Sequence, residues 1–518
     1  MDGGTLMSMT SVFDKVRGRA ETFAVAFVLV VAAGVYASIA LLTYTSIDGI
    51  HYYSLNDDPM ISMRYARNLA EGHGLRWNIG ELPVEGYTNL LWTLLMAAVH
   101  MLPIHESKIS LVIIGLSSLL LLVNAVICCQ LVRRLEVSSA AVIFTAILAA
   151  FYWPLVMWAS DGFEVGLIAC LMSAGILATF GDLNSSARDI FVLTLVLVAL
   201  VLARPDCILP VLVLIGALGV RARQGKVSWW CVSLACSVVL FTEISVTAWR
   251  WYYYGEFLPN TYYLKAIGVP LSDRLPKGLL ALWGMLRSAL WGILLLAIPG
   301  SILMLRAGHR TLVATVWTLF GFACLYTVYL GGDTWERTGI TNRFIAQAVS
   351  PLFVCVAIFI DSVRKPRVLG GAALLLVALI STHSLNAIFN RVRSVAAMVH
   401  SSVKDGAPLR LKQGLWLRAN ARSGDAVGAV WAGAIPYFSR LPSYDLLGKS
   451  DPLIARLKPR GMVWGHNKWS NRYTLEVRRP RFIQQLWRPT VEENREAEAL
   501  QYRINQVGIL EGSDPNRE

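Results

Sequence analysis

Two adjacent carboxylates, Asp57 and Asp58, lie just after the first long apolar run of the chain. Ionisable side chains at a membrane boundary are costly, so this acidic pair is a functional-site hypothesis by default. A carboxylate can act as a general base that takes the proton from a hydroxyl group as its oxygen attacks. The second acid could orient the first, or both could hold a divalent cation through hard oxygen ligands. The sequence leaves both alternatives open.

Three further polar residues follow in the same segment, residues 44–108: Arg64, His73 and Glu85. A single aspartate here could be only a helix cap at the positive end of the helix dipole. Two aspartates in tandem, followed by these polar groups, favour a site instead. We predict that one of the two aspartates is the base and that the three later residues shape the adjoining binding site.

A lysine and two tyrosines recur in a later segment, residues 251–278. Lys265 could hold the phosphate of a membrane-bound donor as a point charge, and Tyr262 and Tyr263 could stack on a sugar ring. The structural alternative is a pair of tyrosines at the membrane interface beside a lysine that extends toward water.

Two arginines near the start of an apolar run provide further positive charge. Arg337 or Arg343 could brace a leaving phosphate, where developing negative charge needs fixed donors. The alternative is an ion pair between one of them and Asp333. The sequence does not choose between these two interpretations.

The acidic pair would be positioned by a short amphipathic helix at the membrane interface. Pro59 lies near its start, Gly72 would end it, and Ile61, Tyr65 and Leu69 would form its apolar face. The carboxylates would then lie at the N-terminal end, where the helix dipole stabilises negative charge.

The rest of residues 1–390 is a series of apolar runs, many of about 20 residues, the length needed to cross the hydrocarbon of a bilayer. The expected fold class is therefore mainly α, a polytopic membrane helical bundle of about 11 spans. Residues 88–103 are short for a span and are predicted to lie in or dip into the interface. The predicted spans are 21–43, 109–132, 139–158, 164–180, 189–203, 206–220, 229–250, 279–304, 311–330, 344–361 and 367–388.

Composition agrees with a membrane protein that carries a soluble region. The chain has 518 residues, of which 55% are hydrophobic and 16% charged, and its net charge is +13. Short basic loops explain that charge, and no recognition motif accompanies it, so nucleic-acid binding is not expected. The eight cysteines show neither a pairing framework nor metal-ligand spacing.

Basic loops also predict how the chain crosses the membrane. Clusters such as Arg133–Arg134, Arg221–Lys226 and Arg306–Arg310 alternate with loops that carry acids and aromatics. The positive-inside rule assigns the basic loops to the cytoplasm, so the acidic pair and the C-terminus face outward. The least secure part is 189–220, because merging its two short spans would invert the second half.

The tail, residues 391–518, is predicted to be a small external α/β domain. An amphipathic helix is expected at 409–421, a buried strand and turn at 424–437, and a second strand ending in a Gly turn at 442–448. The tail carries no phosphate-binding fingerprint, nucleophile elbow or metal spacing. A role in positioning the acceptor or as a lid fits best.

Taken together, these motifs resemble those of bacterial integral-membrane glycosyltransferases of the C-type fold, which use polyprenyl-phosphate sugars. The chain is most similar to the arabinofuranosyltransferase branch, which includes the mycobacterial cell-wall terminal arabinosyl transferases and the pilin-modifying enzyme of Pseudomonas. The first-loop motif is the specific part and the tail motifs are moderately specific. The resemblance rests on the acidic pair and on Arg64–Leu75, Glu85–Asn89, Leu258–Lys265, Ala432–Tyr437 and Gly465–Lys468.

This resemblance implies an inverting transferase in the bacterial inner membrane with its active site and tail in the periplasm. The donor would be decaprenyl or another polyprenyl phosphate carrying D-arabinofuranose, and Asp57 or Asp58 would be the base. The acceptor would be a hydroxyl of pilin or of a cell-envelope glycan. The tail is shorter than the external region of the mycobacterial enzymes, which leaves room for a protein acceptor.

Two other classes of function are alternatives to a transferase. A flippase or transporter of lipid-linked glycans predicts ionisable residues deep within the spans, whereas Glu243 is the main such residue here. A non-catalytic partner in an envelope complex would use the tail for contacts alone.

Overall fold

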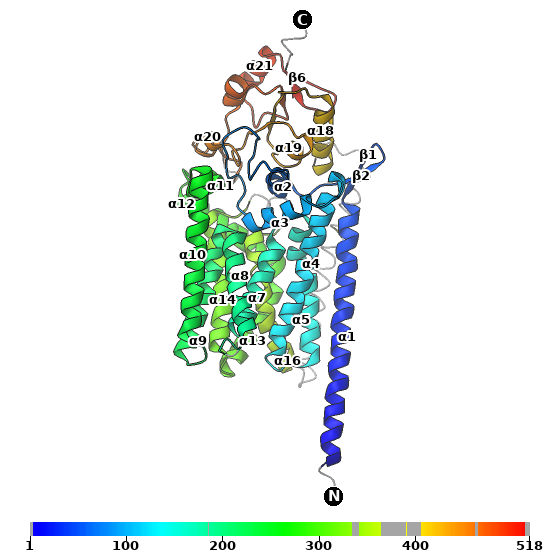
Figure 1. The fold of residues 1–518 in the computed structure, drawn as a ribbon, viewed down its shortest axis with the longest axis vertical. Helices are drawn as coiled ribbons and strands as arrows, with labels where there is room; N and C mark the ends of the chain where they lie inside the picture. The colour runs from blue at the N-terminus through cyan, green and yellow to red at the C-terminus, as the bar shows by residue number, and fades with distance from the viewer. Residues whose placement is uncertain are drawn as a thin grey trace.

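The computed structural model describes residues 4–184, 186–333, 341–363, 390, 406–461 and 465–512. Long helices run side by side as a bundle, and a smaller region of short helices and strands lies on one end of it (Figure 1). The N-terminus lies at the opposite end of the molecule from the C-terminal region (Figure 1). The mainly α fold with a small strand-containing C-terminal region is therefore confirmed.

The bundle is built from apolar helices that begin and end near charged or capping residues. Their bounds are α1 (Gly4–Leu42), α4 (Glu106–Arg133), α5 (Ser139–Phe151), α6 (Trp153–Ser160), α7 (Val165–Thr179), α8 (Ala187–Ala203), α9 (Ile208–Arg223), α10 (Trp229–Tyr254), α12 (Leu271–Met285), α13 (Trp291–Arg306), α14 (Arg310–Leu330), α15 (Arg343–Ala346) and α16 (Phe353–Val363).

Within the described part of the chain, eight helical segments are long and apolar enough to cross a membrane, some of them formed by two consecutive helices. They coincide with eight of the predicted spans. Helices α7 and α8 are shorter, with 15 and 17 residues, and match the predicted spans 164–180 and 189–203. The predicted span 367–388 lies outside the described residues.

The segment 187–223 forms two helices that cross in opposite directions, as the sequence predicted. Arg204, between them, forms an ion pair with Glu164 just before α7. At the far end of α9, Arg221 donates to the carbonyl of Gly181, just beyond the end of α7 (3.2 Å). The join between α8 and α9 is therefore at one end of the bundle and the basic loop after α9 is at the other.

Shorter elements lie between the bundle and the tail region (Figure 1). An antiparallel hairpin follows α1, and α3 has 11 residues, as expected for a segment that does not cross. The bounds are β1 (Tyr44–Ile47), β2 (Ile50–Tyr53), α2 (Asp57–Ala70), α3 (Leu90–His100) and α11 (Asn260–Lys265).

Helix α2 begins and ends as predicted but is not an amphipathic helix at a free interface. Met60 and Met63 pack in one cluster with Trp92 of α3. On its other side, Ile61 and Tyr65 pack in a second apolar cluster. The prediction was wrong because the tail region covers the face that was expected to meet water, and burial of apolar side chains drives this packing.

The tail region contains a five-stranded mixed sheet in the order β4-β3-β5-β7-β6. Strand β3 is parallel to β4 and β5, with Val427 opposite both Ser443 and Phe482, whereas β7 is antiparallel to its two neighbours. The bounds are α18 (Ala407–Asn420), β3 (Val427–Ala429), α19 (Ala434–Ser439), β4 (Ser443–Asp445), α20 (Pro452–Ala455), β5 (Phe482–Ile483), α21 (Val491–Ala499), β6 (Arg503–Ile504) and β7 (Leu510–Glu511).

Two of the three predicted tail elements are confirmed, the helix as α18 and the second strand as β4. The third is only partly right, because residues 434–439, expected to continue a strand and turn, form helix α19. Its buried Phe438 packs with Leu411 of α18, and Ile435 packs with Leu417. These contacts join segments that a local pattern does not relate.

Candidate active site

The acidic pair forms the first turn of α2. Asn56 caps the helix by accepting a hydrogen bond from the Asp57 amide (2.6 Å), and its own amide donates to the Asp161 carbonyl (3.0 Å). The capping residue is therefore Asn56, which leaves both aspartate side chains for other contacts. Their place at the positive end of the helix dipole matches the sequence prediction.

The two carboxylates face different surroundings. Asp58 lines a cavity, and its Oδ1 is 2.7 Å from the Lys449 Nζ. Asp57 is buried, and its Oδ1 accepts a hydrogen bond from the Gly433 amide (3.1 Å). The other oxygen of Asp57 has no hydrogen-bond partner in the described part of the chain. Asp58 is thus the carboxylate that a substrate could reach.

Gly433 allows the tail region to approach the acidic pair this closely. A Cβ atom on Gly433 would lie 2.0 Å from the Asp57 carbonyl oxygen, which is far inside van der Waals contact. This close approach explains a glycine in the segment that joins β3 to α19. The motif Ala432–Tyr437 therefore contacts the start of α2 directly.

The cavity beside Asp58 has an empty volume of about 500 Å³. Three cationic side chains line it, Lys265, Arg343 and Lys449, together with the carboxylates of Asp58 and Glu164. They come from α2, the turn before α7, the end of α11, the start of α15 and the turn after β4. The cavity lies where the bundle meets the tail region.

Lys265 and Arg343 were both predicted to hold a phosphate, and the structure brings both to this cavity. With Lys449 they concentrate positive charge at the cavity, and burial together with the nearby Arg343 lowers the pKa of Lys265. Arg343 Nε is also 2.8 Å from Asp333 Oδ2, so the predicted ion pair exists as well. The two interpretations of Arg343 are compatible. Arg337 lies outside the described residues.

Electrostatics separates the two aspartates. Burial raises the pKa of Asp57, although Arg410 and Lys449 act in the opposite direction. Burial also acts to raise the pKa of Asp58, but Lys449, Arg343 and Lys265 outweigh it and lower that pKa below its ordinary value. Asp58 is therefore ionised at neutral pH and paired with a charged lysine.

A second layer of polar contacts fixes the cavity wall. Glu164 pairs with Arg204 (2.7 Å), which also pairs with Asp206 (2.9 Å). Glu164 accepts a further hydrogen bond from Asn89 (3.0 Å), and Asn89 accepts one from Ser62 of α2 (2.8 Å). This chain of contacts ties α2 to the bundle.

Four predicted binding residues lie elsewhere. The carboxylate of Glu85 forms a buried, two-point ion pair with Arg250, at 2.5 and 3.2 Å. His73 is exposed beyond the far end of α2. Tyr262 is exposed, and the Tyr263 hydroxyl donates to Glu256 (2.9 Å). Their side chains do not line the cavity, so the structure gives no support to a sugar-binding role for them.

Arg64 is also absent from the cavity wall, because its guanidinium is used to join α2 to the tail region. Arg64 donates to the carbonyls of Pro436 (2.5 Å), Leu441 (2.9 Å) and Trp77 (2.8 Å). It also donates to Asn78 Oδ1 (2.9 Å). Its buried position indicates a structural role.

Lys449 is the residue of this cavity that sequence reasoning missed. It follows the Gly turn after β4 and reaches Asp58 across 391 positions of sequence. The only available signal was a lysine after a predicted Gly turn, which is too common to identify a site.

The acidic pair does not fit a resident divalent cation. Asp58 is paired with Lys449, and Asp57 accepts from a backbone amide. In the part of the chain that the structure describes, no three His, Cys, Asp or Glu side chains gather as metal ligands. Hard cations bind several oxygen ligands at once, which this arrangement does not offer.

Comparisons with known proteins identify the fold of the chain. A family model described as a domain of unknown function (DUF8728) matches residues 399–507, and no curated protein matches the chain. ArnT from Cupriavidus metallidurans in the apo state aligns with a TM-score of 0.53 at 14% identity, over 82% of this chain and 86% of that one. ArnT bound to undecaprenyl phosphate aligns with a TM-score of 0.54 at 13% identity, over 88% of each chain. This chain therefore has the glycosyltransferase C-type fold.

Proposed function

We propose that this protein transfers a sugar from a polyprenyl phosphate to a hydroxyl acceptor. The observation that carries the proposal is a carboxylate and three cations around one cavity, at the end of a bundle of apolar helices. The carboxylate supplies a base for the acceptor, and the cations supply charge for a phosphate. The fold shared with ArnT, which has been crystallised with undecaprenyl phosphate, supports a lipid phosphate as donor.

In the proposed reaction, Asp58 takes the proton of the acceptor hydroxyl as its oxygen bonds to the anomeric carbon. The bond between that carbon and the phosphate oxygen breaks, and the polyprenyl phosphate leaves with the bonding electrons. Lys265 and Arg343 stabilise the negative charge that develops on the phosphate. A single displacement of this kind inverts the anomeric centre.

The cations also explain how a carboxylate of low pKa can act as a base. Lys449, Arg343 and Lys265 keep Asp58 ionised while the cavity holds no phosphate. A donor phosphate would neutralise part of that charge and make the Asp58 carboxylate more basic when the donor is bound. Asp57, buried behind it, would orient the first turn of α2.

The sugar and acceptor that we propose rest on sequence resemblance. The donor sugar is D-arabinofuranose, and the acceptor is a hydroxyl of pilin or of a cell-envelope glycan in the periplasm. Transfer is favoured over transport because the charged residues that line the cavity gather at one end of the bundle, whereas a transporter would need a polar path through it.

Single substitutions of the two aspartates test this proposal. Asp58→Asn should lower the rate of transfer from labelled polyprenyl-phosphate sugar by about 10²- to 10⁴-fold, the contribution of a general base. Asp57→Asn should have a smaller effect, and Asp48→Asn, on the exposed turn between β1 and β2, should have none. Expression and thermal unfolding are measured for each variant.

Full transfer activity in Asp58→Asn, Asp57→Asn and the double variant would overturn the assignment. Movement of the labelled lipid across proteoliposomes without any transfer would favour a transporter instead.

A further inference from the structure

A second, larger cavity lies in the tail region and is lined by four arginines. This arginine cleft, with an empty volume of about 1380 Å³, is defined by Arg422, Arg478, Arg479 and Arg481, with Ser423 and Asp425 beside them. Among the described residues that line the cleft, Asp425 is the only acidic one, so the four arginines leave an excess of positive charge. The lining of the cleft is more polar than that of a typical small-molecule pocket, which is mostly apolar.

Two of the arginines are fixed by neighbouring acids. Arg481 pairs with Asp425 (3.2 Å) and Glu511 (3.0 Å), and Arg478 pairs with Asp451 (3.3 Å). Even so, the Nε–H groups of Arg478 and Arg481 lack acceptors in the described part of the chain. Each of these two guanidinium groups thus has one N–H donor for which the described residues provide no acceptor.

The other two arginines are exposed at the cleft. The Arg479 Nε donates to the Glu476 backbone carbonyl (2.8 Å), and none of the described carboxylates forms an ion pair with it. Arg422 extends from the turn before β3 and is exposed as well. Guanidinium groups gathered in this way repel one another, and they match carboxylate and phosphate groups through paired N–H donors.

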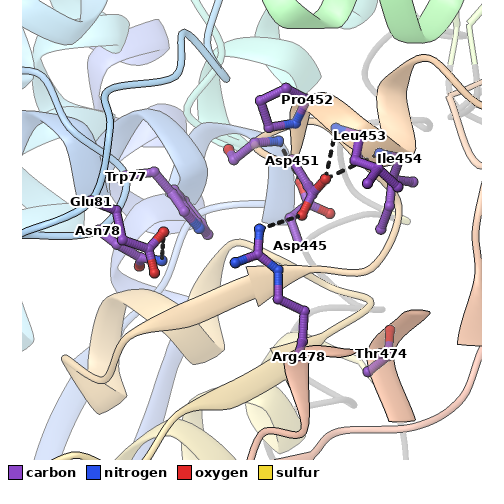
Figure 2. A network of polar contacts seen from close by, with 12 residues as sticks. Trp77, Asn78, Glu81, Asp445, Asp451, Pro452, Leu453, Ile454, Thr474 and Arg478 are labelled. Carbon is purple, nitrogen blue, oxygen red and sulfur yellow. Dashed lines mark hydrogen bonds and ion pairs between the residues drawn. The ribbon is translucent and has the colours of Figure 1, made fainter. Parts of the chain in front are cut away.

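One wall of the cleft reaches the start of α20 through the contact of Arg478 with Asp451 (Figure 2). Arg478 contacts Asp451, whose Oδ1 also accepts from the amides of Leu453 and Ile454 at the start of α20. Asp451 lies two residues after Lys449, the partner of Asp58. A ligand in the cleft would therefore be held against the turn that supplies a cation to the catalytic cavity.

We propose that the arginine cleft binds an acidic glycan, a carbohydrate segment of the acceptor that bears carboxylate or phosphate groups. The role of the cleft as an acceptor subsite rests on the proposed function, whereas the binding of an acidic glycan to the cleft does not. A glycan is favoured over an acidic protein because the cleft offers little apolar surface to anchor a protein side chain: Leu475 and Tyr502 are buried, and Tyr444 and Leu500 are half-buried. The fully exposed lining residues carry guanidinium, hydroxyl and backbone groups, which suit a hydroxylated, charged polymer.

The test measures binding of tetragalacturonate, a short uronic acid oligomer, to the full-length protein in detergent by titration calorimetry. Wild-type protein should bind it, and binding should weaken as salt increases. The same oligomer with methyl-esterified carboxyl groups, and a tetraglutamate peptide, should bind at least tenfold more weakly. The double variant Arg422→Gln/Arg479→Gln should also lose at least tenfold in affinity, whereas Arg495→Gln, an exposed arginine on α21, should match wild type.

Equal binding of the esterified oligomer, equal binding of the peptide, or unchanged affinity in the double variant would each overturn the proposal. So would absence of binding by wild-type protein. Thermal unfolding of each variant checks that the fold is kept. If wild-type protein transfers sugar but does not bind tetragalacturonate, only the proposal for the arginine cleft is overturned. If the protein binds tetragalacturonate but does not transfer sugar, only the proposed function is overturned.

Discussion

Asp57 and Asp58 are adjacent and chemically identical, yet the protein gives them opposite electrostatic environments. Asp57 is buried against the backbone of Gly433, whereas Asp58 faces the cavity and Lys449. Burial raises the pKa of the first, and the surrounding cations lower the pKa of the second. When the environments of two neighbouring acids shift their pKa values in opposite directions, the two acids are suited to different roles. The sequence alone could not distinguish them.

Asp445 is a further acid on which the catalytic cavity depends. Its two oxygens accept from the amides of Leu447 (3.0 Å) and Ser450 (2.7 Å), and these bonds close the turn that carries Lys449. Burial raises the pKa of Asp445 to about 6, although Lys449 and the two amides lower it. The ionised carboxylate is the better acceptor for both bonds.

We therefore expect transfer activity to fall as the pH drops below about 6, because protonation of Asp445 weakens the turn that holds Lys449. The measurement is a pH–rate profile of wild type and of Asp445→Asn. The variant should be less active at pH 7.5 and should lack the acid limb centred near this pKa. A flat wild-type profile between pH 5 and 7.5 would contradict the role of Asp445.

Stability should change in the opposite direction over the same range. The pKa of Asp445 is raised above 3.8 in the folded protein, so the folded state binds more protons than the unfolded state between these values. Its contribution to the free energy of unfolding is present at low pH and is lost, by about 3 kcal/mol, as the pH rises through this window. Loss of activity at pH 5 would thus not reflect unfolding through this group.

Among the elements, α11 shows how the tail region positions a residue of the bundle end. The fully buried Lys468 donates to the carbonyls of Tyr263 (2.8 Å), Ile267 (2.9 Å) and Ala455 (2.7 Å). Two of these carbonyls flank Lys265, the proposed phosphate ligand. Lys468 therefore fixes the end of α11 to α20.

Replacing Lys468 by Met should destabilise the protein by about 3 kcal/mol, because three carbonyls, of which that of Ala455 is buried, lose a charged donor. We expect a lower melting temperature and at least a tenfold loss of transfer, since Lys265 would no longer be held at the cavity. Lys458→Met, at an exposed position in the same region, is the matched control and should change neither. A Lys468→Met protein with the wild-type melting temperature would contradict this role.

Across the whole molecule, local patterns predicted much of the fold and about half of the candidate site. Apolar runs gave the spans, and helix signals placed the acidic pair on the first turn of α2. The rest depends on contacts between distant segments, such as Lys449 with Asp58 at the cavity and Arg250 with Glu85 away from it. No local period encodes these pairings, so Lys449 was missed and Glu85 was assigned a binding role.

The arrangement of charges along the bundle also bears on its orientation in the membrane. The candidate active site lies at the tail-region end, whereas the basic loop after α9 lies at the other end, where Arg221 contacts the end of α7. The positive-inside rule places that loop in the cytoplasm. We therefore expect the cavity and tail region to face the periplasm, where nucleotide sugars are absent and the proposed lipid-linked donor could serve.

Labelling of introduced cysteines tests this orientation. In spheroplasts, a membrane-impermeant maleimide should label Ser46→Cys, at an exposed position of the hairpin at the tail-region end of the bundle (Figure 1). It should label Gln224→Cys, in the exposed basic loop after α9, only after the membrane is permeabilised. The parent protein is the control for its own cysteines, which lie in or beside the apolar helices. The reverse pattern would place the carboxylate of Asp58 in the cytosol, where a nucleotide sugar could serve as donor, and would remove the reason for a polyprenyl-phosphate substrate.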